Sequence, residues 1–154
     1  MAYKFITPTL RHPSPTAGEY IAEITAIGTK NRDGEKLVSR NGDPKISLAL
    51  LLVGSDGGLY EMTDYVTLPA LDENGQPQSD AGVYLLRKLS EILRALGHDM
   101  QAGEGFEINS AAFVNRTAKV RIEIREAAGK MYPEIKSWSL SPRNQQKVSD
   151  EIKF

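Results

Sequence analysis

Apolar residues recur along five short stretches of the chain, in most of them in alternation with polar residues, and this pattern predicts strands. The stretches are 20–28, 45–53, 59–66, 117–126 and 129–138. The second is almost entirely apolar, and the turn GSDGG at 54–58 connects it to the third as a hairpin. Tyr20 alternates with core positions, so we expect its ring inside the protein.

One stretch has the period of a helix instead. Leucine and isoleucine recur at spacings of three and four residues along 83–96, which predicts an amphipathic helix. Ser79 or Asp80 is suited to its N-terminus, and Gly97 to its end. The order of elements is therefore three strands, one helix and two strands.

This order predicts the fold class. Five short antiparallel strands with one α-helix between strands 3 and 4 are the order of an OB-fold, although other small α+β barrels share it. We predict a mainly β protein, a five-stranded antiparallel OB-fold barrel at 18–140. Residues 1–17 contain three prolines and are expected to form an extended N-terminal arm, and 141–154 a flexible C-terminal tail.

The last predicted strand has an unusual exposed face. At period two, its side chains divide into two sets: Met131 and Ile135 inward, and Tyr132, Lys136 and the single tryptophan, Trp138, outward. Two alternatives stay open. Trp138 belongs to the core, as large rings often do, or Tyr132 only forms a cross-strand pair. A bulge at Pro133 would shift the register by one residue and bury Trp138.

Composition excludes several classes of protein. The 154 residues fit one domain, and the absence of cysteine excludes disulfides, thiolate metal sites and thiol catalysis. No stretch approaches the roughly 20 apolar residues that a membrane span needs. No signal peptide is visible at the N-terminus. We therefore expect a cytoplasmic protein without a membrane partner.

The net charge of −1 conceals an uneven distribution. Residues 29–45 contain five basic and three acidic residues, which gives a net charge of +2. Residues 115–138 contain six basic and three acidic residues, which gives a net charge of +3. Residues 54–80 contain six acidic residues and no basic one. In an OB-fold, the loops between strands 1 and 2 and between strands 4 and 5 flank the ligand groove. Those are the two basic segments.

Single-stranded nucleic acid is held by basic groups along its backbone and by rings that stack on its bases. The last two strands bring both kinds of group together, with one more ring on the third strand: Lys119, Arg121, Tyr132, Lys136 and Trp138, and Tyr65. The alternative for the two cations of the fourth strand is an ordinary solvated face, because they alternate with Glu123.

Residue patterns typical of enzymes are scarce. The two histidines, His12 and His98, lie in expected loops, away from carboxylates with ligand spacing. Asp64, Asp72 and Glu73 leave a magnesium-dependent nuclease as a further alternative, although acidic loops usually serve solubility. We expect no catalysis, no cofactor and no metal site.

Six segments together resemble phage and prophage single-stranded DNA-binding proteins with an OB-fold: AGEYIAEI, NGDPKISLALLLV, YEMTDYV, LRKLSEILRALG, KVRIEIRE and GKMYPEIKSW. The likeness covers about residues 17–140. It implies binding of single-stranded DNA without sequence preference, in phage DNA replication or recombination inside the bacterial host. It also implies contacts from the first long loop: Lys30, Arg32, Lys36 and Lys45.

Proteins of this kind often end in an acidic tail with a terminal Phe, which docks replication partners. This chain ends SDEIKF, so Asp150, Glu151 and Phe154 match, but three basic residues outnumber the two acids of the tail. Docking of phage or host replication proteins is therefore implied only in part.

A second interpretation of the function is an OB-fold protein-interaction module of a phage replication or recombination complex, with little DNA affinity. An exposed edge strand also leaves a homodimer open.

Overall fold

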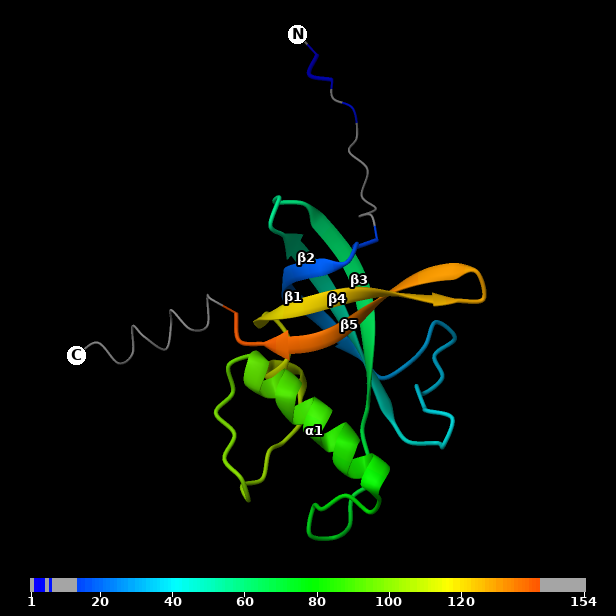
Figure 1. Ribbon diagram of the computed structural model, residues 1–154, viewed down its shortest axis with the longest axis vertical. Coiled ribbons are helices and arrows are strands. Elements are labelled where there is room, and N and C mark those ends of the chain that lie inside the picture. Colours follow the sequence, from blue (N-terminus) through cyan, green and yellow to red (C-terminus); the bar gives the residue numbers. More distant parts are fainter. Residues whose placement is uncertain (1, 5, 7–13, 142–154) are drawn as a thin grey trace, which may run out of the picture.

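The structure, a computed structural model, describes residues 2–4, 6 and 14–141. Its elements, drawn in Figure 1, are β1 (Gly18–Gly28), β2 (Lys45–Gly54), β3 (Leu59–Thr67), α1 (Asp80–Ala95), a 3-10 turn η1 (Ser110–Ala112), β4 (Thr117–Ala127) and β5 (Lys130–Ser139). The prediction of a mainly β protein with five antiparallel strands and one helix between β3 and β4 is confirmed. The tail residues Asp150, Glu151 and Phe154 lie outside the described residues.

All five strands form one sheet in the order β3-β2-β1-β4-β5. Because β4 returns beside β1, the first four strands have the spatial order of a Greek key. The long return connection contains α1, which packs against β4 and β5. Within the described residues no ladder joins β3 to β5, so the sheet is open at these two edges.

The core lies between one face of the sheet and α1. Tyr20, Ala22 and Ile24 of β1 point into it, as the alternation predicted. The buried side of α1 adds Leu89, Ile92 and Leu93, among others. Of the two residues expected at the N-terminus of this helix, Ser79 is the cap, and its side chain accepts a hydrogen bond from the Gly82 N–H. No described helix is long and apolar enough to cross a membrane.

A bulge in β1 resets its alternation. Ile24 lies opposite Leu50 and Ala26 opposite Ala49, which leaves Thr25 as an extra residue. Its hydroxyl donates a hydrogen bond of 3.2 Å to the Ala49 carbonyl. After the bulge, Ile27 returns to the core side. The bulge therefore places Ile27 on the same face of β1 as Ile24, although a regular alternation would separate them.

A second bulge corrects the predicted register of β5. Ile135 lies opposite Ile122, Ser137 lies opposite Arg121, and Lys136 between them is the extra residue. Ile135 and Trp138 consequently face the same side, and only 6% of Trp138 is exposed. The outward placement of Trp138 was wrong because β5 does not keep period two. Met131 lies on the same side of β5 as Ile135, as predicted, but it is near the tip of the hairpin and 63% exposed, so it does not join the core.

Candidate functional site

The outer face is the side of the sheet turned away from the core, and one tyrosine stands at its β3 edge. Tyr65 lies opposite Ser47 in the β2–β3 ladder and is 48% exposed. The Lys45 ammonium nitrogen lies 5.1 Å from the centre of its ring. Such a cation–π contact orients the ring while leaving much of it open to a planar ligand. Both residues were predicted contacts, and the structure brings them together.

A second tyrosine–cation pair lies on the β4–β5 hairpin. Tyr132 is directly opposite Arg125, whose guanidinium carbon lies 5.8 Å from the centre of the ring. Tyr132 points outward as predicted and is 41% exposed. Arg125 was not among the predicted contacts. A two-residue turn at Ala128 and Gly129 sets the register that places Arg125 opposite Tyr132. Because two-residue hairpin loops fix the pairing of the flanking strands, the sequence could have predicted this pair.

The two predicted cations of β4 are already paired with carboxylates. The Lys119 ammonium lies 3.0 Å from Glu19, and the Arg121 guanidinium lies 4.0 Å from Glu123. All four side chains are well exposed, so each pair adds little to stability. A polyanion would compete with these carboxylates for the same cations. This part of the outer face is therefore a weaker candidate for phosphate contacts.

Lys136 and Trp138 lie elsewhere, at a hollow of about 380 Å³ between α1 and β5. Arg87 and Lys88 of α1 line the same hollow. The Lys136 ammonium lies 3.8 Å from Glu134. The indole N–H of Trp138 is buried without a hydrogen-bond partner. The structure thus separates these two residues from the outer-face tyrosines, and a buried ring is not available for stacking on a base.

The first long loop, residues 29–44, places its cations in solvent. Lys30, Arg32, Lys36 and Arg40 are all exposed. Within the described part of the chain, none of them forms an ion pair with a carboxylate. In Figure 1, this loop and the β4–β5 hairpin project to the same side of the molecule. Arg40 contributes to the positive charge of the loop in the sequence, but it was not among the predicted contacts.

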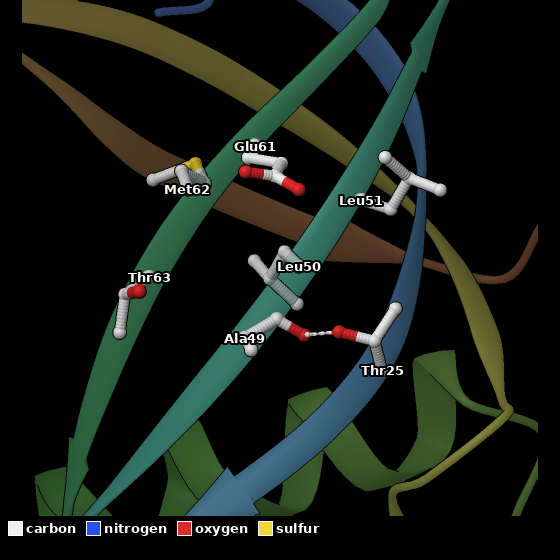
Figure 2. A pocket seen from close by; sticks show the side chains of 7 residues that line it. All are labelled: Thr25, Ala49, Leu50, Leu51, Glu61, Met62 and Thr63. Atoms are coloured by element: carbon white, nitrogen blue, oxygen red, sulfur yellow. Dashed lines mark hydrogen bonds between the residues drawn. The ribbon is translucent and has the colours of Figure 1, made fainter. Parts of the chain in front are cut away.

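Small side chains occupy the middle of the outer face. Figure 2 shows Thr25, Ala49 and Thr63 at one level across β1, β2 and β3. Together with the neighbouring Leu51 and Glu61 they line a shallow hollow of about 460 Å³. Because the side chains of Thr25, Ala49 and Thr63 are small, an extended ligand could lie across these strands toward Tyr65.

The acidic residues proposed for a metal site are not gathered at one place. Asp64 lies on the core side of β3, opposite Leu48, and burial raises the pKa of its carboxyl above the ordinary 3.8, opposed by Lys88. Asp72 instead accepts the backbone N–H groups of Asn74 and Gln76. Among the described residues, no group of three or more His, Asp or Glu side chains is arranged to hold a metal ion.

His98 also lies in a loop, as predicted. Its Nε2 is 2.8 Å from the Ala112 carbonyl, and its ring meets Phe106 edge to face. It therefore helps to pack the segment that follows α1.

No model of a known protein family matches the chain, and no curated protein matches it either.

Proposed function

We propose that this protein binds single-stranded DNA without sequence preference on the outer face of its sheet. The observation that supports this most directly is the presence of two exposed tyrosines, each beside a cation, at separate parts of that face. Bases stack on the rings of Tyr65 and Tyr132, and Lys45 meets a phosphate. Arg125, whose guanidinium lies 3.7 Å from the Glu134 carboxylate, holds the Tyr132 ring in place instead. Such stacking tolerates every base, which explains a lack of sequence preference.

The topology supports the same proposal. A five-stranded, partly open Greek-key sheet with one helix between β3 and β4 agrees with an OB-fold, in which the face of strands 2 and 3 and two flanking loops hold the ligand. Here those loops are residues 29–44 and the β4–β5 turn. The resemblance to phage single-stranded DNA-binding proteins extends the proposal to a role in phage DNA replication or recombination.

Fluorescence anisotropy of a labelled oligo-dT strand tests the proposal. At low salt the protein should raise the anisotropy in a saturable way. The logarithm of the binding constant should then fall linearly with the logarithm of salt concentration, with a slope of about −0.7 per phosphate contacted. A mixed-sequence strand of the same length should bind with similar affinity. A flat titration with both strands at low salt would exclude DNA binding.

A second candidate is a protein-interaction module of a replication or recombination complex. The paired charges on β4 favour it, because Lys119 and Arg121 with Glu19 and Glu123 form a face of mixed charge. Such a face suits a protein surface that is itself mixed in charge. Partner capture that survives nuclease treatment, together with no oligonucleotide binding, would select this candidate over the first.

A further inference from the structure

Four turns of the chain share one backbone hydrogen-bond pattern. The N–H of the first residue donates to the carbonyl of the fifth, and the N–H of the fourth donates to the carbonyl of the first. The fourth residue is a glycine with positive φ in every case: Gly34, Gly42, Gly57 and Gly75. The turns span 31–35, 39–43, 54–58 and 72–76. They can therefore be compared position by position.

The residue at the second position differs between the two turns of the first long loop and the two turns outside it. It holds Arg32 and Arg40 in the two turns of the loop, but Ser55 and Glu73 in the other two. Both arginines are exposed and form no ion pair within the described residues. The same position in two adjacent copies of one turn thus presents the same side chain.

The backbone of the loop is ordered by its own hydrogen bonds. Each turn is closed by a bridge, Lys30 with Lys36 and Val38 with Pro44. The Leu37 N–H donates to Thr29, and the Leu37 carbonyl accepts from Lys45 at the start of β2, so both turns are tied to the sheet. Holding the loop in place before a ligand arrives lowers the entropy lost on binding.

We propose that residues 29–44 form a two-pronged phosphate clamp, in which Arg32 and Arg40 each bind one phosphodiester group of the bound strand. The inference rests on the proposed function and adds the residues and the loop geometry that hold the backbone. A guanidinium matches a phosphate through paired hydrogen bonds, which an ammonium cannot form. With Lys45 included, the loop has a net charge of only +2, so diffuse attraction is weak and the placement of the two arginines decides the affinity.

The first test removes the prongs and measures anisotropy with oligo-dT. Arg32→Ala and Arg40→Ala should each weaken binding roughly fivefold or more at low salt, and each should make the salt slope shallower by about 0.7. Arg32→Lys and Arg40→Lys keep the charge, so they should weaken binding with the slope unchanged. Glu73→Ala alters the matching position of a turn outside the loop and should leave affinity within twofold of wild type.

The second test disturbs the turns without changing any charge. Gly34→Ala and Gly42→Ala place a side chain at φ of +79° and +84°, where an added Cβ meets no atom within 4 Å. Gly75→Ala is the matched control, at φ of +77° with the same open surroundings. The loop variants should weaken oligo-dT binding severalfold, whereas the control should not, although all three suffer similar backbone strain.

The outcomes separate the two proposals. If the wild-type protein does not bind oligo-dT at low salt, the proposed function fails and the clamp fails with it. If wild type binds and the double variant Arg32→Ala/Arg40→Ala binds equally well, the clamp is overturned while DNA binding stands. If the arginine variants weaken binding but Gly34→Ala and Gly42→Ala do not, the arginines act as diffuse charge, and the clamp is again overturned.

Discussion

At the scale of single residues, Trp138 has a structural place rather than an exposed one. Its ring lies opposite Val120 on the core side of the sheet, and its indole N–H has no hydrogen-bond partner. A buried N–H without a partner contributes nothing favourable in exchange for its lost hydration. The stabilising part of this side chain is therefore its apolar ring, packed between α1 and β5.

Trp138→Ala should consequently lower the free energy of unfolding by about 3–5 kcal/mol, because it leaves a cavity in the core. Trp138→Phe keeps a ring and removes only the unpaired N–H and some volume, so its cost should be much smaller. Urea denaturation of both variants measures the difference. Iodide should quench wild-type tryptophan fluorescence poorly. Equal stability of wild type and Trp138→Ala would contradict the buried placement.

Asp64 is a second residue with a measurable consequence. Burial raises the pKa of its carboxyl above 3.8, and the Lys88 ammonium opposes that shift. One oxygen of the carboxyl is buried without a hydrogen-bond partner. The folded state therefore binds the proton more tightly than the unfolded state does. Stability is lost as pH rises from 3.8 through the raised pKa of the folded protein.

Asp64→Asn should therefore raise the melting temperature at pH 7, by about 2–4 °C for each kcal/mol gained. The advantage over wild type should vanish as pH falls below 3.8, where the wild-type carboxyl is protonated. Thermal melts across this pH range measure it. Glu126→Gln, which removes a charge at an exposed position, is the control and should show no such gain. A destabilised Asp64→Asn at pH 7 would mean that the attraction of Lys88 outweighs burial.

At the scale of elements, periodicity in the sequence predicted the type and order of every strand and of α1. It could not predict where a strand gains an extra residue. The bulges at Thr25 and Lys136 are backbone features, and the residue types around them do not indicate that the hydrogen-bond ladder is irregular there. Each bulge moves the following residues to the opposite face. This is why Tyr132, before the second bulge, was placed correctly, whereas Trp138, after it, was not.

The β4–β5 turn allows a test of register and strain together. Ala128 has a φ of 50° and Gly129 a φ of 77°, the signs that a two-residue type I′ turn requires. Alanine is strained in this region, whereas asparagine tolerates it. Ala128→Asn should raise the free energy of unfolding by about 0.5–1 kcal/mol, and Ala128→Val should lower it, because a β-branched side chain tolerates positive φ poorly. Chemical denaturation would measure both, and a loss of stability in Ala128→Asn would contradict the turn.

At the scale of the whole molecule, the chain separates its charges in a way that net charge does not reveal. The loop 29–44 keeps its cations without ion pairs within the described residues. Four cations of β4 and β5 instead lie beside carboxylates of the same sheet: Lys119, Arg121, Arg125 and Lys136. In the sequence, the two basic segments, residues 29–45 and 115–138, have similar net charges. Only the fold shows which carboxylates come beside which cations, because Glu19 and Lys119 are a hundred residues apart in the chain.

Because of this separation, the tyrosine rings of the outer face and the cations of the loop 29–44 should affect binding in different ways: the rings its affinity alone, the cations also its salt dependence. Tyr65→Ala and Tyr132→Ala each remove a stacking ring but no charge. Each should weaken oligo-dT binding by about 1–3 kcal/mol, or roughly 5- to 150-fold, and leave the salt slope unchanged. The arginine variants of the loop should instead change the slope. The two tyrosines share no partner, so the double variant should show the sum of the two losses.

Anisotropy titrations at several salt concentrations resolve both effects in one data set. Tyr84→Ala is the control, because this ring is exposed on α1, away from the outer face. If Tyr65→Ala and Tyr132→Ala bind as tightly as Tyr84→Ala while binding stays salt-dependent, the strand is held by charge alone. The outer face would then not be the stacking platform, and the path of the DNA would have to follow the loop 29–44 and the cations of α1.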